Sequence, residues 1–219
     1  MKEMRLLIHR RVLSCLLVAL SAMGMLSGCD LFSTRTPESP DTGSQFIWTP
    51  ASTPHLLLEN FKGSLQEVDG TNHSKCFISD NDSTTTGEKL IYHFVPRSGL
   101  DASSQSIFDG WSPTSEKNYI VKLRSLLMAD PKLSVIISNE KIEQNDVHSA
   151  KVDFDYTVLI PVEGSSTVPS SISGSAQFQC ELITTEQGTK EWRVVWMYDY
   201  VASGSSSKTF SDLKVLMTL

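Results

Sequence analysis

The chain has 219 residues, of which 40% are hydrophobic and 20% charged, and its 25 acidic residues outnumber the 19 basic ones for a formal net charge of −6. A chain that repels phosphate and has no run of Lys and Arg lacks the positive surface that supplies most affinity for nucleic acids. We therefore expect no nucleic-acid partner. The same acidity argues against broad contact with anionic lipid.

The first 28 residues are predicted to be a secretory signal. Four basic residues and one acid, Glu3, precede the uncharged apolar stretch Val12–Leu26. This stretch is shorter than the roughly 20 helical residues that span a bilayer, so a cleaved signal is favoured over a permanent transmembrane helix. Its removal leaves the rest of the chain with a net charge of about −9.

The signal ends in Leu26-Ser27-Gly28-Cys29, which resembles the lipobox of bacterial lipoprotein precursors. The resemblance implies cleavage before Cys29 and acyl chains such as palmitate on its sulfur and new amino group, which hold a protein on a membrane. Asp30 resembles a signal for retention in the inner membrane, so in a Gram-negative envelope we expect the periplasmic face of that membrane. An ordinary signal peptide with a chance cysteine is the alternative.

Residues 29–53 are rich in Pro, Ser and Thr and are predicted to form a flexible stalk. Such a composition buries too little apolar surface to offset the entropy of ordering the chain, and its prolines keep it extended. Phe46, Ile47 and Trp48 interrupt the polar run. These side chains either dock on the following domain, which we favour, or bind a partner.

Residues 54–219 are enough for one domain with a sizeable core, and its first element is predicted to be a helix. Thr53 can cap this helix, and Pro54 suits its first position. Apolar residues then recur at helical spacing, at Leu58, Phe61, Leu65 and Val68. Asp69-Gly70 is predicted to end the helix.

A short strand and a second helix follow. The segment KLIYHFVP alternates in the manner of a strand, and Pro96 prevents further ladder bonding there. The second helix is predicted to begin near Ser112-Pro113 and to end before Pro131. It runs through EKNYIVKLRSLLMAD with one apolar stripe, formed by Ile120, Leu123 and Leu127.

The rest of the chain is predicted to be β-structure. The segment LSVIIS precedes three longer strands, and the last two of these form a hairpin around Gly188. Their inward side chains are predicted to be Val152, Phe154, Tyr156 and Val158, then Ala176, Phe178, Cys180 and Leu182, then Trp192, Val194, Trp196 and Tyr198. The opposite, solvated face is predicted to carry the acids Asp153, Asp155, Glu181 and Asp199.

This order of elements resembles the nuclear transport factor 2-like superfamily, and more narrowly its bacterial lipoproteins with no assigned role. The resemblance covers about residues 53–216 and also rests on the Y-x-F-x-P of Tyr92, Phe94 and Pro96 and on the tryptophan-rich last strand. It implies an α+β fold in which a cone-shaped, curved antiparallel sheet packs against N-terminal helices. A pocket between sheet and helices is then the default binding site.

The candidate lining of this pocket is aromatic and consists of Tyr92, Tyr119, Phe154, Tyr156, Phe178, Trp196 and Tyr198. Enzymes of the superfamily, such as those similar to ketosteroid isomerase or scytalone dehydratase, place an Asp or a His/Asp pair on inward strand positions. Here the acids fall on outward positions, so no catalytic residue is assigned. A bulge of one residue would reverse this parity and favour an enzyme.

Two cysteines, Cys76 and Cys180, remain after signal removal and lipidation. They can form a disulfide in an oxidising compartment, but Cys180 is predicted on the apolar side of its strand, where a free buried thiol is favoured. The histidines are scattered without a second ligand at zinc-binding spacing, and DNDSTTTGE lacks the Gly and Glu of a calcium loop. No metal and no cofactor are expected.

The sequence thus predicts a membrane-anchored lipoprotein of the cell envelope that acts as a non-enzymatic binding module. Its expected partners are the membrane, through the anchor at Cys29, and either a small apolar ligand or an envelope protein. The resemblance also implies homodimerisation through the outer face of the sheet. The alternative function is a small-molecule isomerase or dehydratase that acts in the cone.

Overall fold

The computed structural model describes residues 46–127, 132–144, 146–162, 167–202 and 206–219. The predicted signal, Cys29, the stalk up to residue 45 and Pro131 lie outside these residues. The compact unit that contains the described residues spans Ser44–Leu219. Within the described stretches, no helix combines the length and the apolar character needed to cross a bilayer.

The two long helices begin where the sequence predicts. Helix α2 (Pro54–Gln66) is capped by Thr53, whose hydroxyl accepts the N–H of Leu56. Helix α5 (Pro113–Leu126) is capped in the same way by Ser112. The predicted apolar positions of the first helix are all buried, namely Leu58, Phe61, Leu65 and Val68.

Three short helices were not predicted. Asp69 does not end α2 but caps α3 (Gly70–Ser74), because its carboxylate accepts the N–H of Asn72. Helix α4 (Ala102–Ser106) follows β2, and α6 (Phe210–Thr218) ends the chain. Of these, α6 brings a charged side chain into the interior, as described below.

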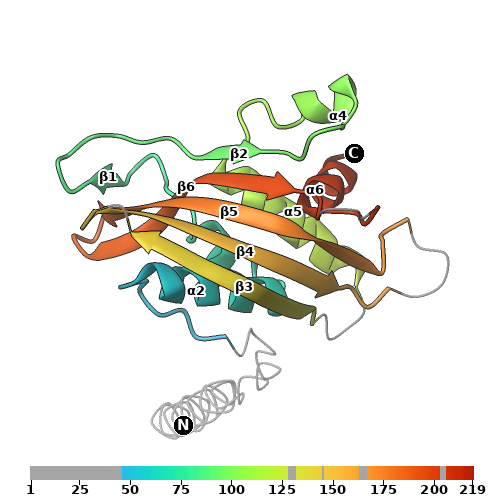
Figure 1. Cartoon of the computed structure of the whole chain (residues 1–219), viewed down its shortest axis with the longest axis horizontal. Helices are drawn as coiled ribbons and strands as arrows, with labels where there is room; N and C mark the ends of the chain where they lie inside the picture. The colour runs from blue at the N-terminus through green and yellow to red at the C-terminus, as the bar shows by residue number, and fades with distance from the viewer. Residues whose placement is uncertain (1–45, 128–131, 145, 163–166, 203–205) are drawn as a thin grey trace, which may run out of the picture. The chain divides into compact units, whose positions relative to one another are not determined.

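The strands form one mixed sheet, in the order β2-β6-β5-β4-β3 with β1 against β5 (Figure 1). They span Ser83–Thr84 (β1), His93–Val95 (β2), Ser134–Gln144 (β3), Ser149–Leu159 (β4), Ser171–Thr184 (β5) and Lys190–Tyr200 (β6). Neighbours among β3 to β6 are antiparallel as predicted, whereas the edge strand β2 is parallel to β6. The predicted α+β class, with a curved sheet packed against helices, is confirmed.

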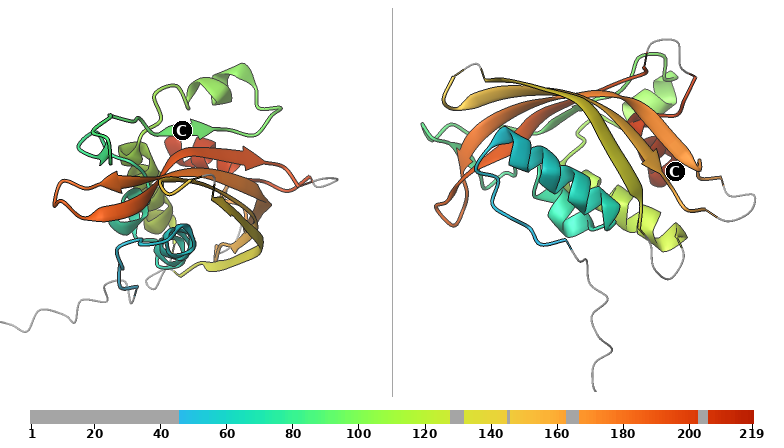
Figure 2. Two further views of the ribbon diagram at one scale, coloured as in Figure 1. Left: turned by 60° about the vertical axis from the view of Figure 1, so that its left-hand side comes forward. Right: turned by 60° about the horizontal axis from the view of Figure 1, so that its bottom comes forward.

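The long helices lie on one side of the sheet, which curves around them (Figure 2). Phe61 of α2 stands at the centre of the layer between them. Its ring packs at 5.0 Å against Phe178 and at 6.3 Å against Phe154, and it also contacts Phe210 of α6 at 5.9 Å. These edge-on ring contacts fill the core densely.

The last residues of the predicted stalk pack on the domain. Trp48 is partly buried against the core, between Lys75 and Arg193, whose cationic groups lie 5.6 and 5.5 Å from its ring. The ring of Phe46 lies so close to Gly63 that a Cβ there would come within 2.4 Å of it. The predicted docking is therefore confirmed for Phe46 and Trp48, whereas Ile47 is 83% exposed.

Candidate functional site

Aromatic side chains occupy the space between sheet and helices where the resemblance implies a pocket. Five of the predicted lining residues are buried there: Tyr92, Tyr119, Phe154, Tyr156 and Phe178. Tyr92 packs at 4.6 Å against Phe77, and Tyr156 stacks at 4.0 Å on Phe210. These rings contact other side chains instead of lining an open cone.

A β-bulge in the last strand changes the predicted parity. Gln179 pairs with Trp196, whereas the next residue of β5, Cys180, pairs with Val194. Val195 is therefore an extra residue in β6. After such a bulge, each side chain of the strand points to the side of the sheet opposite to the one that strict alternation predicts.

Because of the bulge, the predicted orientation is wrong for two residues of the pocket lining and for one acid predicted to face solvent. Trp196 and Tyr198 lie on the side of the sheet away from the helices and are only half-buried. Asp199, predicted to face solvent, is turned into the interior and is 1% exposed. By contrast, Asp153 and Asp155 of β4 point outward as predicted.

Glu116 of α5 and Lys214 of α6 form an ion pair inside the domain. The Glu116 Oε1 atom accepts hydrogen bonds from Lys214 Nζ at 2.6 Å, from the Tyr92 hydroxyl at 2.7 Å and from the Trp111 indole N–H at 2.8 Å. Neither charged side chain is reached by solvent. We name as the buried charge cluster the residues His73, Tyr92, Trp111, Glu116, Tyr119 and Lys214.

The positions of Glu116 and Lys214 follow from where their two helices begin. Ser112 and Pro113 begin α5 so that Glu116 falls in its first turn, where the helix dipole favours a carboxylate. Helix α6 begins after Thr209, whose backbone N–H donates to the Asp212 carboxylate. This helix was not predicted from the sequence, although Thr209 followed three residues later by Asp212 is the pattern of a capping box.

Aromatic rings surround the ammonium group of Lys214. Its Nζ atom lies 3.5 Å from the centroid of the Phe94 ring and 5.6 and 5.4 Å from those of Trp111 and Tyr119. Attraction to the ring faces adds to the ion pair with Glu116. These contacts stabilise the buried charge from within the protein.

His73 completes the cluster from α3. The Ser64 hydroxyl donates to the Phe61 carbonyl, and its oxygen lies 3.1 Å from His73 Nδ1. His73 Nε2 lies 3.2 Å from the Tyr119 hydroxyl. It also lies 3.5 Å from Glu116 Oε2, which accepts no hydrogen bond from any described residue.

The ionisation of the cluster follows from its burial and pairing. Burial alone raises the pKa of a carboxyl, but the charge of Lys214 and the contact with His73 outweigh it and lower the pKa of Glu116 to about 2. Burial lowers the pKa of His73 from its ordinary value, against the attraction of Glu116. Glu116 is therefore a carboxylate at neutral pH, and His73 is uncharged.

Asp199 is a second interior acid with internal partners. Its Oδ1 atom accepts the Tyr156 hydroxyl at 2.7 Å, and its Oδ2 atom accepts the backbone N–H and the hydroxyl of Ser211 at 2.8 and 2.5 Å. The Tyr156 oxygen in turn accepts the N–H of Phe210. These bonds attach the first turn of α6 to β6 and β4, and they occupy both oxygens of Asp199.

Two surface hollows border the cluster, and neither of them is lined by Glu116. One of 380 Å³ and one of 210 Å³ share Trp111 in their walls, together with Tyr119 in the first and Tyr92 in the second. A third, of 520 Å³, lies beside Trp48 and Arg193. The residues that line these three hollows include neither Glu116 nor Asp199, but the third is lined by two other buried acids, Asp82 and Glu191.

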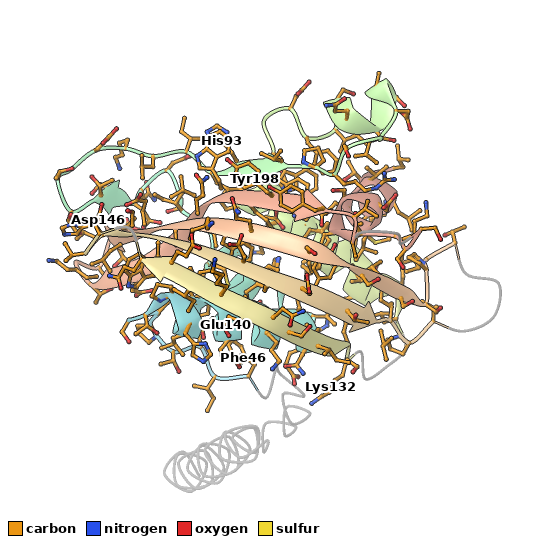
Figure 3. The ribbon with its side chains drawn as sticks, viewed as in Figure 1. Phe46, His93, Lys132, Glu140, Asp146 and Tyr198 are labelled. Carbon is orange, nitrogen blue, oxygen red and sulfur yellow. The ribbon has the colours of Figure 1, made fainter. Side chains whose placement is uncertain are left out.

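The side of the sheet turned away from the helices, which we name the outer face, is a second candidate site. Its side chains form three rows across the strands: Ser138, Asp155, Ser175 and Tyr200; Lys141, Asp153, Gln177 and Tyr198; and Glu143, Lys151, Gln179, Trp196 and His93. His93 and Tyr198 mark its aromatic margin at the β2–β6 edge (Figure 3).

The cysteines do not form the disulfide that the sequence left open. Cys76 and Cys180 are both buried free thiols. Burial raises the pKa of Cys76 to about 12, so it is not a nucleophile at neutral pH. Within the described residues, no group of three or more His, Cys, Asp or Glu side chains is arranged to hold a metal ion.

No family model matches the chain, and no curated protein does. Solved structures do resemble it, at low identity. The β subunit of benzoate 1,2-dioxygenase from Burkholderia mallei is 14% identical, with a TM-score of 0.46 over 71% of this chain and 93% of that chain. A nuclear transport factor 2-like protein of unknown function in nutrient uptake from Rhodospirillum rubrum is 13% identical, with a TM-score of 0.42 over 68% and 97%.

A protein of unknown function with a cystatin-like fold from Nostoc punctiforme is 14% identical, with a TM-score of 0.42 over 69% of this chain and 90% of that chain. One of the structures similar to this chain is thus described as a nuclear transport factor 2-like protein. No ligand or activity is transferred from any of them.

Proposed function

We propose that this protein is a non-catalytic binding module that a lipid on Cys29 holds at a bacterial membrane. The lipid anchor is argued from the sequence Leu26-Ser27-Gly28-Cys29 alone. The absence of catalysis is argued from the interior, because an enzyme of the cone type needs an acid or base that a substrate can reach.

The observation that carries the proposal is that Glu116 and Asp199, the two acids buried between the sheet and the helices, are bonded to partners within the protein. Glu116 Oε1 accepts three donors, and both oxygens of Asp199 are used to hold α6. Both side chains are buried. A substrate would have to displace these contacts before it met either carboxylate, so these acids serve the fold.

Two observations favour the alternative of an isomerase or dehydratase. The bulge in β6 turns Asp199 into the interior. Glu116 Oε2 accepts no hydrogen bond from the described residues, and Trp111, which donates to Glu116 Oε1, lines two of the hollows. Movement of Trp111 would expose a carboxylate with a free acceptor oxygen. The experiment that tests the proposal therefore measures whether the indole of Trp111 opens to solvent.

The indole Nε1–H of Trp111 reports on this opening through its hydrogen exchange, followed by NMR. If the interior is closed, we expect exchange to be at least a hundredfold slower than that of the half-buried Trp196. Equal exchange rates for the two indoles would contradict a closed interior and favour the enzyme. The anchor is tested separately by the mass of the mature N-terminus, where Cys29→Ser must abolish acylation.

A further inference from the structure

The outer face carries a continuous row of aromatic rings along its β6 margin. The rings of His93 and Trp196 stack at 4.0 Å across paired strands. Trp196 and Tyr198 follow at 6.0 Å with their planes 16° apart, and Tyr198 and Tyr200 at 6.4 Å with their planes 3° apart. Successive side chains on one side of a strand thus present nearly parallel rings.

The stacking of His93 on Trp196 indicates how the ring planes are oriented relative to the sheet. Paired strands are about 4.8 Å apart, so two rings that meet face to face at 4.0 Å must rise from the sheet with their planes along the strands. His93 therefore covers the β2 side of Trp196. The nearly parallel rings of Tyr198 and Tyr200 continue this aromatic wall, and its other side faces β5.

Polar groups in fixed orientations lie beside this wall. Gln179 donates to the Tyr198 hydroxyl at 3.3 Å, and Gln177 donates to Asp153 at 2.6 Å. Further across the sheet, Asp155 accepts from Ser175 at 2.6 Å and from Asn139 at 2.7 Å. Each of these groups keeps further donor or acceptor capacity toward solvent, because a carboxylate has about four acceptor sites and an amide two donors.

The charges of the outer face decide among occupants. The acids Asp153, Asp155 and Glu143 outnumber the bases Lys141 and Lys151 in its three rows. Both lysines are paired with acids of the same rows, so these rows offer an anion no unpaired lysine and oppose it with one excess negative charge. A neutral ligand with many hydroxyl groups meets no such cost and uses both the wall and the polar groups.

We propose that the outer face binds a neutral carbohydrate chain, whose sugar rings pack their C–H faces on Trp196, Tyr198 and Tyr200. The ring faces provide apolar area with little loss of side-chain entropy, and the hydroxyls of the sugar bond to the amides and carboxylates of β5 and β4. This assignment names the ligand class of the binding module and rests on the proposed function in that respect.

The test is a titration of the full chain, purified in a mild detergent, with chitohexaose and cellohexaose, followed by calorimetry and tryptophan fluorescence. We expect at least one of the two to bind, and a sulfated hexasaccharide not to bind. Trp196→Ala should weaken binding at least tenfold. The matched control is Ile136→Ala, which removes a 53% exposed side chain on β3 of the same face and should change affinity less than twofold.

If Trp196→Ala does not fold, Tyr200→Ala replaces a 45% exposed ring and should weaken binding at least threefold. Absence of binding by both neutral sugars would overturn the proposal, as would unchanged affinity in the variants. A stable dimer that Trp196→Ala dissociates would assign the face to a second copy instead. The hydrogen exchange of the Trp111 indole distinguishes the two failures. If it is slow, only the carbohydrate proposal is wrong and the protein is still a non-catalytic binding module. If it is fast, the proposed function itself is wrong.

Discussion

Lys214 Nζ lies 2.6 Å from Glu116 Oε1, and this contact joins two helices whose paired residues are 98 positions apart in the chain. Charges taken fully out of water are costly, and a buried pair is stable only when its remaining hydrogen-bonding groups are also satisfied. Here Tyr92 and Trp111 supply that support on the side of the carboxylate. The pair therefore links α6 to α5 inside the domain.

Loss of the carboxylate should destabilise the protein strongly. In Glu116→Gln the amide oxygen still accepts from Tyr92 and Trp111, but the ammonium of Lys214 remains buried without its counter-charge. We expect the free energy of unfolding to fall by about 3–5 kcal/mol. Urea denaturation followed by fluorescence measures this change.

A second variant separates the charge from the packing. Glu116→Gln with Lys214→Met removes both charges and keeps similar volumes, so we expect it to regain at least half of the lost stability. The control is Glu143→Gln, which breaks exposed ion pairs with Lys141 and Lys151 and should leave the midpoint of urea denaturation unchanged. A double variant as unstable as the single one would show that packing, and not charge pairing, causes the loss.

Stability should fall as the pH decreases from 7 to 5. Burial lowers the pKa of His73, so below its ordinary value of 6.5 the unfolded chain binds a proton that the folded chain does not. Unfolding is favoured by this difference, and the effect is absent at higher pH, where both states are neutral. Chemical denaturation at a series of pH values measures the free energy of unfolding. Between pH 7 and 5 this free energy should fall less steeply in His73→Gln than in the unaltered protein.

His55 provides a control of opposite sign. Its hydrogen bond to Glu140 raises its pKa, so it contributes stability below pH 6.5 that is lost as the pH rises through the folded value. His55 is largely exposed, and the contribution is therefore small. His55→Gln should make the decline on acidification slightly steeper. A flatter decline in this variant would contradict the assignment of the slope to His73.

Much of the fold could be predicted because local signals agree with it. Thr53-Pro54 and Ser112-Pro113 start helices through side-chain caps, and strict alternation around Phe154 places the side chains of β4 correctly. These signals lie within a few residues of the element that they define. No long-range contact is needed to read them.

The charge cluster could not be predicted because its members meet only in the folded chain. Glu116 appears in the sequence as one polar residue of an amphipathic helix, and Lys214 stands in a segment too short for a clear helical period. Val195 likewise gives no sign of a bulge, since a run of apolar residues fits either parity. The prediction therefore failed for Trp196, Tyr198 and Asp199, which follow it.

The two thiols should not react in the folded protein. Cys76 and Cys180 are buried, and burial raises the pKa of both, so thiolate is scarce and a reagent cannot approach. We expect neither of these two thiols to react with a disulfide reagent at pH 8 in the folded chain, and both to react after unfolding. Val147→Cys, at a position 70% exposed, is the reference and should react at once. A mass unchanged by alkylation after unfolding without reductant would instead demonstrate a disulfide.

Removal of Asp199 should release the C-terminal helix. In Asp199→Ala the Tyr156 hydroxyl and the Ser211 N–H lose their acceptor inside the protein, and each unsatisfied group costs about 1–3 kcal/mol. We expect faster hydrogen exchange in α6, measured by mass spectrometry, together with a lower Tm. Asp153→Ala on the outer face removes a partly exposed acid and should leave the exchange of α6 unchanged. If α6 stays as protected in Asp199→Ala as in the unaltered protein, Asp199 does not hold this helix, and a role for its carboxylate in chemistry must be considered again.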